Sequence, residues 1–171
     1  MKNILKRLYE NLETAGTYPL SNIDINNILN CPIIEFGDFD KFNNINEIIP
    51  SSRGAVVLFL RNNKNGIGHW CALIRDDNYI EFFDSYGENL LKGNKSFNKL
   101  INGFTYIYNP VQLQNRKSSI NTCGFHVIWR LYCFLYKNMN LPHFLKFMNE
   151  PKDHDRAVVY YITEIINKHN L

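Results

Sequence analysis

The stretch Asn121-Thr122-Cys123-Gly124-Phe125-His126 opens a long segment in which apolar residues recur with a helical period. From Cys123 to Tyr136 they cover most of the helical circumference, which predicts a helix buried against a sheet. The start of a helix offers backbone N–H groups without intrahelical partners, together with the positive end of the helix dipole. A cysteine placed there can be held as a thiolate, which is the nucleophilic form of its side chain.

Polar residues interrupt this helix along one line. They follow one another at i, i+4, i+7 and i+11, and we expect that line to face solvent. Its members are His126, Arg130, Cys133 and Lys137.

Upstream of the helix the apolar pattern becomes that of strands. Three successive runs joined by turn-forming residues predict an antiparallel meander, and a fourth strand follows before the helix. The first connection covers residues 62–68, and the second is the tight turn Arg75-Asp76-Asp77-Asn78. The expected strands cover residues 55–60, 70–74, 79–83 and 105–108.

Helical spacing predicts further helices on either side of these strands. The chain has no repeat and no linker, so we expect one α+β domain over residues 1–171. Its sheet should be mostly antiparallel and should pack against the buried helix that carries Cys123. The other helices are expected over residues 2–14, 22–29 with Ser21 as N-cap, part of 38–49, 141–149 and 153–168.

The composition limits the location and partners of the protein. Of its 171 residues 45% are hydrophobic and 14% aromatic, which is enough to offset the ordering entropy of a folded chain. The net charge of +3 leaves nucleic acid open as a partner without indicating it. No apolar run has the length of a signal peptide or a membrane span, so we expect an intracellular protein without a membrane partner. Four cysteines without a CxxC pair indicate free thiols in a reducing compartment.

Two upstream residues supply what a nucleophilic Cys123 would need. His69 begins one expected strand and Asp84 follows the next, so an antiparallel pairing brings their ends side by side. The carboxylate can then orient the imidazole, and the imidazole can share a proton with the thiol. Each residue alone has a plainer interpretation, as a packing or turn residue, but the three together indicate a thiol protease. We interpret Cys71, on the same strand as His69, as a core residue.

A thiol protease also needs hydrogen-bond donors for the oxygen of its tetrahedral intermediate. The backbone N–H groups of Cys123 and Gly124 supply part of this set, and the side-chain amide of Gln114 or Gln112 supplies the rest. We attribute Gly124 to the room that an approaching substrate backbone requires. No cofactor or metal is expected, and Asp153-His154-Asp155 is interpreted as a helix cap rather than a metal site.

The combination of Gly68-His69-Trp70, residues 83–87, Gln114 and Thr122-Cys123-Gly124 resembles the adenovirus maturation protease, adenain, and the related ubiquitin-like-protein-specific proteases. The resemblance spans roughly residues 20–137 in order and residue type. The short chain and its composition look most like the versions found in virophages and Maverick/Polinton elements.

The resemblance implies an adenain-like α+β cysteine protease fold and cleavage of capsid or other virion precursor proteins, in the virion and in the cytoplasmic viral factory of the infected cell. It implies His69 as base, Asp84 as its orienting group, Cys123 as nucleophile and Gln114 as oxyanion donor. Gln114 lies nine residues before Cys123, which is more than is usual in the family. The DNA and peptide activators of the adenovirus enzyme have no counterpart that this sequence identifies.

Two other functions remain open at this stage. The same residues suit a protease that removes ubiquitin or a ubiquitin-like modifier from host proteins, because both activities need a narrow cleft for glycine. The chain can also be a binding module that kept the fold and lost activity. The complete set of His69, Asp84 and Cys123 favours an enzyme, while the oligomeric state stays open.

Overall fold

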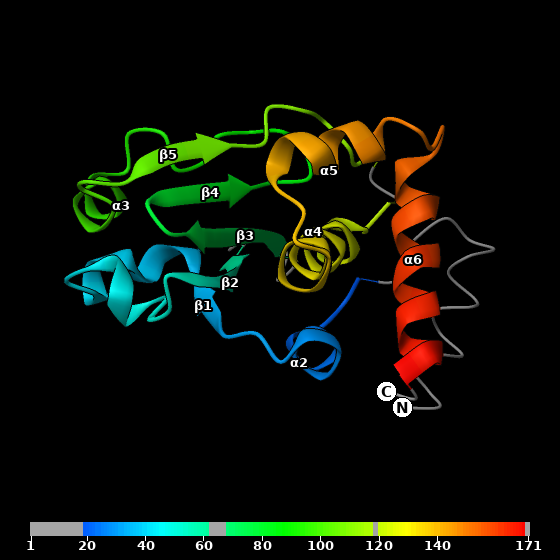
Figure 1. Ribbon diagram of the computed structural model, residues 1–171, viewed down its shortest axis with the longest axis horizontal. Helices are drawn as coiled ribbons and strands as arrows, with labels where there is room; N and C mark the ends of the chain where they lie inside the picture. The colour runs from blue at the N-terminus through cyan, green and yellow to red at the C-terminus, as the bar shows by residue number, and fades with distance from the viewer. Residues whose placement is uncertain (1–18, 62–67, 118–119, 170–171) are drawn as a thin grey trace.

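The computed structural model describes residues 19–61, 68–117 and 120–169. The expected helix over residues 2–14 and nearly all of the expected loop over 62–68 lie outside these ranges. A five-stranded sheet forms the centre of the fold, with helices on both of its faces (Figure 1). In spatial order its strands are β1 (Ile33–Glu35), β2 (Arg53–Leu60), β3 (His69–Asp76), β4 (Tyr79–Phe83) and β5 (Thr105–Tyr108).

The predicted meander is confirmed. Strands β2, β3 and β4 pair antiparallel, and the register of Asp76 with Tyr79 leaves a two-residue turn between β3 and β4. Both edge strands pair parallel to their neighbours, so the sheet is mixed rather than mostly antiparallel. Strand β5 is parallel to β4 because the connection between them crosses over through a helix, which a parallel pair requires. Strand β1 has three residues, too few for a periodic sequence signal.

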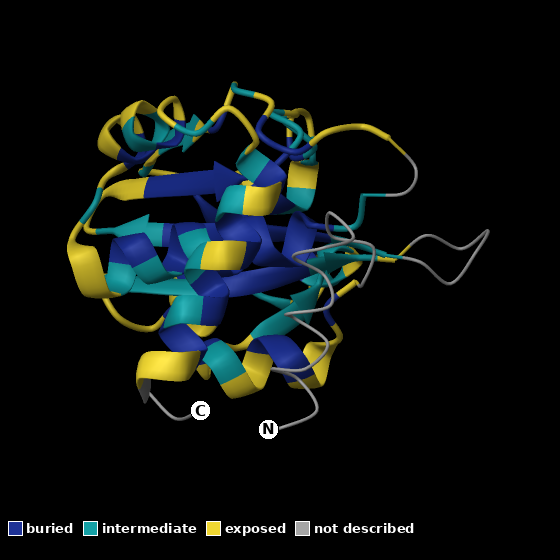
Figure 2. Ribbon diagram, turned by 90° about the vertical axis from the view of Figure 1, so that its right-hand side faces the viewer, coloured by how far each residue is buried: buried dark blue, intermediate teal, exposed yellow. Residues whose placement is uncertain are grey.

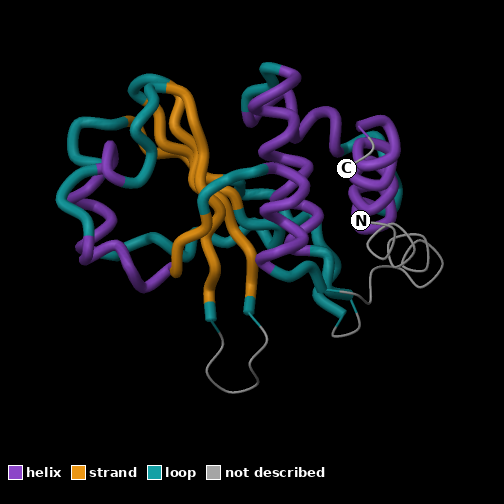
Figure 3. The backbone as a smooth tube through the Cα atoms, turned by 90° about the horizontal axis from the view of Figure 1, so that it is seen from below, coloured by secondary structure: helices purple, strands orange, loops and turns teal. Residues whose placement is uncertain are grey.

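The two faces of the sheet carry separate apolar clusters. Along β3, Ala72 and Ile74 face one cluster, whereas Cys71 and Leu73 face the other, as the alternation of a strand requires. Figure 3 shows the sheet between the two groups of helices, and Figure 2 shows the buried residues gathered where the layers meet. The first cluster packs against α4 (Cys123–Lys137). The second packs against α3 (Lys95–Leu100) and the 3₁₀ helices η1 (Phe36–Lys41) and η2 (Ile45–Glu47).

The remaining helices agree closely with the predicted ones. Ser21 caps α2 (Asn22–Leu29) with a capping box, in which its hydroxyl and the Asp24 carboxylate each accept a backbone N–H. The helix α3 was not predicted, because it is short and only Phe97 and Leu100 mark its buried side. Within the described ranges no helix is both long and apolar enough to cross a membrane. The bounds are α2 (Asn22–Leu29), α3 (Lys95–Leu100), α5 (Leu141–Met148) and α6 (His154–His169).

The prediction that the polar line of α4 faces solvent is wrong for three of its four residues. His126, Arg130 and Cys133 are buried, and Lys137, at the end of the helix, is exposed. The reason is that α4 is covered on more than one side, because it lies between the sheet and α6 (Figure 1). His126 meets Asp155 of α6, and Arg130 meets Glu81 of the sheet. Buried polar groups then need partners inside the protein, and His126 and Arg130 have them.

Arg130 binds the Glu81 carboxylate of β4 with two hydrogen bonds, from Nε to Oε1 at 2.7 Å and from Nη2 to Oε2 at 2.6 Å. Its Nη1 also donates to the carbonyl of Met139 at 2.8 Å. The side chains of both partners are almost fully buried, at 1% and 6% exposure. This bidentate ion pair prevents α4 from sliding relative to β4.

We predict that Arg130→Met lowers the free energy of unfolding by about 3 to 5 kcal/mol, because it leaves the Glu81 carboxylate buried without its cation. Urea unfolding measures the change. Replacing both partners, as Glu81→Leu with Arg130→Met, should cost less than the single change. Arg61→Met is the matched control, because it breaks an exposed ion pair with Glu35 and should leave the unfolding free energy nearly unchanged. A loss no larger than in this control would contradict the prediction.

Candidate active site

His69 and Asp84 meet at one end of the antiparallel pair β3 and β4. His69 is the first residue of β3, and Asp84 directly follows the last residue of β4. The Nε2 atom of His69 lies 2.6 Å from Oδ1 of Asp84. The carboxylate is 1% exposed, while the imidazole keeps 17% of its surface open. The structure thus brings together the base and the orienting group that the sequence suggested.

A tight turn holds the Asp84 carboxylate in place. The backbone N–H of Tyr86 donates to Oδ1 at 3.3 Å, and that of Glu88 donates to Oδ2 at 3.0 Å. The turn places Gly87 at φ +73°, where a Cβ atom would also lie 2.7 Å from the carbonyl carbon of Val111. Glycine is therefore required here both for its backbone conformation and for the close approach of the two segments.

Cys123 is the first residue of α4. Its side chain is 8% exposed, and its thiol is one of the groups that favour the charged form of the His69 imidazole. Burial of the ring opposes its charge, but the hydrogen bonds to Asp84, Cys123 and Cys71 outweigh this and raise the pKa of His69. A charged imidazolium is the partner that a thiolate needs.

Aromatic stacking restrains the imidazole from its open side. The ring of Tyr86 stacks on that of His69 with centroids 5.0 Å apart and planes 20° apart. The guanidinium of Arg116 lies 5.0 Å from the Tyr86 ring and binds the carboxylate of Glu88. Tyr86 and Arg116 therefore form the part of the site that is exposed next to His69.

The other thiols have environments that suppress their reactivity. Burial raises the pKa of Cys31 and of Cys71 to about 11 and that of Cys133 to about 12. Cys71 also contacts His69, whose hydrogen bond opposes this rise in its pKa without cancelling it. All three cysteines are buried in the apolar clusters, so the interpretation of Cys71 as a core residue agrees with its position.

Gln114 connects the Asp84 and Cys123 segments. Its Oε1 accepts the hydroxyl of Ser85 at 2.8 Å, and its Nε2 donates to the carbonyl of Ile120 at 3.2 Å. The side chain is 1% exposed. Gln112 is exposed, and its amide donates to the backbone carbonyl of Gln114 at 3.0 Å. The structure thus places Gln114, rather than Gln112, between the two segments.

The structure gives a different reason for glycine at position 124 from the one that the sequence suggested. A Cβ atom at this position would lie 3.1 Å from Cβ of Leu20 and 3.2 Å from Cδ1 of Trp70. The indole N–H of Trp70 in turn donates to the carbonyl of Leu20 at 3.0 Å. The glycine therefore allows α4 to begin close against these two residues, and this contact is within the protein rather than with a substrate.

One group of described side chains has the composition of a metal site. The ligand atoms of His69, Cys71 and Asp84 lie within 4.8 Å of one another. The 2.6 Å separation of Nε2 and Oδ1 is that of a hydrogen bond, whereas two ligands of a tetrahedral zinc ion lie about 3.3 Å apart. The arrangement fits a hydrogen-bonded histidine and aspartate pair better than it fits the ligands of an ion.

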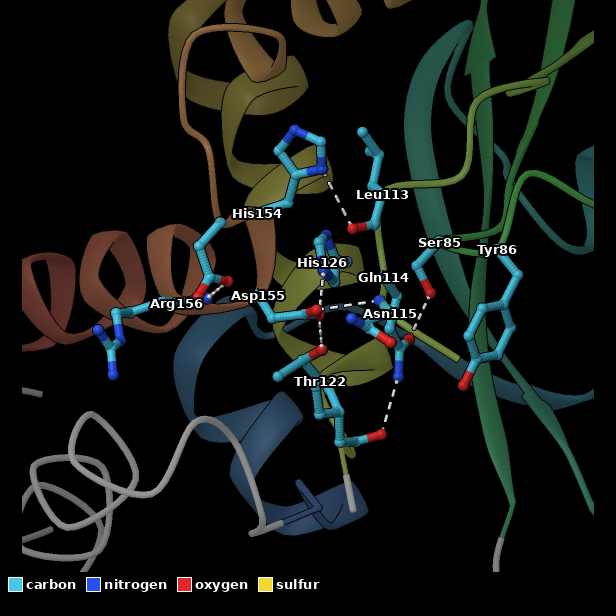
Figure 4. Close-up of polar contacts among 12 residues, drawn as sticks. Ser85, Tyr86, Leu113, Gln114, Asn115, Thr122, His126, His154, Asp155 and Arg156 are labelled. Carbon is cyan, nitrogen blue, oxygen red and sulfur yellow. Dashed lines mark hydrogen bonds and ion pairs between the residues drawn. The ribbon is translucent and has the colours of Figure 1, made fainter. Parts of the chain in front are cut away.

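The sequence did not reveal a second histidine and aspartate pair behind Cys123. Asp153 caps α6 as expected, by accepting the backbone N–H of Arg156 at 3.0 Å. Asp155, however, is buried and lies 3.1 Å from Nε2 of His126 (Figure 4). The sequence did contain one indication that Asp155 is buried. Its spacing places it on the same side of α6 as the buried residues Val158 and Val159.

No protein-family model matches the sequence. The chain is similar to the uncharacterized protein V9 of Sputnik virophage, with 32% identity. The alignment covers 77% of this chain and 83% of the virophage protein. The similarity thus extends over most of both proteins.

We predict that His126→Gln makes the protein less sensitive to mild acid. Burial lowers the pKa of His126, although the hydrogen bond to Asp155 favours its charged form. As the pH falls below the pKa of an unfolded histidine, about 6.5, the unfolded chain therefore takes up a proton that the folded chain does not. The contribution of His126 to the unfolding free energy is therefore complete above that pH and decreases as the pH falls below it. Glutamine can still donate to Asp155 and does not titrate.

Urea unfolding between pH 7.5 and pH 5 measures this difference. The decrease in unfolding free energy should be smaller in His126→Gln than in the wild type. His143→Gln, on the exposed side of α5, is the control that removes a histidine without touching the core. An equal decrease in wild type and His126→Gln would mean that His126 is already charged in the folded protein.

Proposed function

This chain belongs to the same family as protein V9 of Sputnik virophage, and we propose that it is a viral cysteine endopeptidase with an adenain-like fold. Its substrates would be capsid or other virion precursor proteins, cleaved during particle maturation in the virion and in the cytoplasmic viral factory. The observation that carries the proposal is the meeting of His69, Asp84 and Cys123 at the ends of β3, β4 and α4. The virophage relationship favours a virion protein as the substrate.

The proposed reaction begins with the Cys123 thiolate and the His69 imidazolium. The sulfur attacks the scissile carbonyl carbon, and the carbonyl oxygen takes up the electron pair of the broken π bond. When the intermediate collapses, the C–N bond breaks and His69 gives its proton to the leaving amine. His69 then takes a proton from water, whose oxygen attacks the thioester and releases Cys123. Asp84 keeps the imidazole oriented throughout.

The developing oxyanion would be stabilised at the start of α4. The first backbone N–H groups of the helix have no intrahelical acceptor and point away from it. Thr122, in the N-cap position, makes no side-chain capping bond to them. The Gln114 amide would add a neutral donor, because Ser85 holds its oxygen and thereby turns its nitrogen toward the segment that precedes Cys123.

The experiment that tests the function compares two substrates, a virion precursor from the same genome and a ubiquitin-like modifier fusion. We predict that the wild type cuts the precursor, that Cys123→Ala and His69→Ala cut neither substrate, and that Asp84→Asn is about 10²- to 10⁴-fold slower. Cys133→Ala, a buried thiol far along α4, is the matched control and should stay active. Cleavage of the modifier fusion instead would make the protein a deconjugating protease.

A thiol-directed label separates an inactive fold from an enzyme that lacks its activator. Iodoacetamide at pH 7 should modify Cys123 before the other three cysteines, because burial raises the pKa of those three thiols to about 11 or 12. The reaction should be slower in His69→Ala. Mass spectrometry reports the site. Equal labelling of all four thiols, or a rate indifferent to His69, would support a binding module without catalytic activity.

We also predict that Gln114→Met lowers kcat by about 10²- to 10³-fold with little change in KM, because a lost oxyanion donor acts only in the transition state. Methionine has nearly the same size and no N–H group. Gln112→Met is the matched control and should retain kcat, since the Gln112 amide binds a backbone carbonyl at the surface. The reverse order of effects would assign the donor role to Gln112. Steady-state kinetics on the precursor substrate decides between the two.

A further inference from the structure

We propose that Asp155 is a positioning residue of this site, whose single carboxylate fixes both the segment that carries Cys123 and the segment that carries Gln114. The inference rests on the proposed function of these two residues and goes beyond it. Asp155 belongs to α6, the last helix of the chain, and acts only through their neighbours in sequence.

Three donors converge on the Asp155 carboxylate (Figure 4). Oδ1 accepts the hydroxyl of Thr122 and, at 3.1 Å, the Nε2–H of His126. Oδ2 accepts the backbone N–H of Asn115 at 2.9 Å. Thr122 precedes Cys123 directly, and Asn115 follows Gln114 directly. The carboxylate therefore binds the immediate sequence neighbour of each of the two residues that it would position.

The role of Thr122 differs from that of an ordinary N-cap residue. An N-cap side chain normally accepts a backbone N–H of the first helical turn and so holds the helix start. The Thr122 hydroxyl instead donates to Asp155, which is acceptor-only when ionised. The start of α4 is thus held from outside by α6, and the N–H groups of its first turn are left for the oxyanion.

The network is built to hold a permanent negative charge. Among the described residues, the Nδ1 atom of His126 is buried without a hydrogen-bond partner, which fits a neutral ring that donates from Nε2. Burial favours protonation of Asp155, but its hydrogen bonds to His126, Thr122 and Asn115 outweigh this and lower the pKa of the carboxyl group. His154, on the same helix, has its Nδ1 3.2 Å from the carbonyl of Leu113.

The geometry also explains why the loss of these Asp155 contacts should lower the rate of catalysis. A displacement of about 1 Å at a reacting group can cost 10²-fold in rate. A carboxylate that holds Thr122 and Asn115 together limits the relative movement of the thiol, which would attack the carbonyl carbon, and of the amide, which would bind the carbonyl oxygen. Apolar contacts of Val158 and Val159 with the core keep α6 itself in place.

The test compares Thr122→Val, which keeps the size of the side chain and removes the hydroxyl, with Thr122→Ser, which keeps the hydroxyl. We expect kcat to fall about 10- to 100-fold in Thr122→Val with KM within twofold, and to stay within about threefold in Thr122→Ser. Asp155→Asn should also lose at least tenfold, because an amide offers one acceptor where three donors meet. Thermal unfolding confirms that each variant is folded at the assay temperature.

The rate of Cys123 alkylation between pH 5 and pH 9 gives a second readout that needs no substrate. A thiol held against His69 should be labelled about tenfold more slowly at pH 7 in Thr122→Val, and at the wild-type rate in Thr122→Ser. If His69→Ala is slowed and Thr122→Val is not, the positioning role is wrong while the proposed function stands. If His69→Ala is labelled as fast as the wild type, the proposed function itself fails. Equal losses in Thr122→Val and Thr122→Ser that follow only thermal stability would also overturn the inference.

Discussion

The burial of the Asp84 carboxylate is the constraint on which the candidate site depends. An ionised carboxylate with 1% exposure must be surrounded by donors, because an unpaired charge would be costly inside the protein. Its donors are the His69 imidazole and the backbone of the following turn, and the Asn109 amide adds a hydrogen bond to the Asp84 carbonyl at 2.7 Å. Satisfying the carboxylate therefore fixes the start of β3 against the end of β4. The backbone carbonyl of the same residue holds the chain that leads on to Gln114.

The strands and helices with long, regular patterns could be predicted from the sequence, and so could the approach of His69 to Asp84. Strands β2 to β4 alternate between two buried faces, and a tight turn joins two of them. An antiparallel register then places residues far apart in the chain next to each other without further information. Cys123 was placed correctly at a helix start because the apolar period of α4 begins there.

What the sequence did not reveal depends on contacts between segments that are far apart. A line of polar residues on a helix has the same spacing whether it meets water or buried partners, so the partners Glu81 and Asp155 could not be inferred from α4 alone. The position of Gln114 between the Asp84 and Cys123 segments likewise depends on its contact with Ser85, almost thirty residues earlier. Short elements such as β1 and α3 have too few residues to establish a period.

The buried pair of Glu81 and Arg130 has a consequence for how this fold can change its length during evolution. Arg130 lies two helical turns after Cys123, and Asp84 lies three positions after Glu81. The ion pair therefore fixes the position of the thiol relative to the Asp84 carboxylate. An insertion or deletion in either interval would move Cys123 relative to Asp84. Between Asn115 and Ile120, by contrast, extra residues leave both anchored ends in place. Relatives of this chain should therefore vary in length there, which accommodates the unusual nine-residue separation of Gln114 and Cys123.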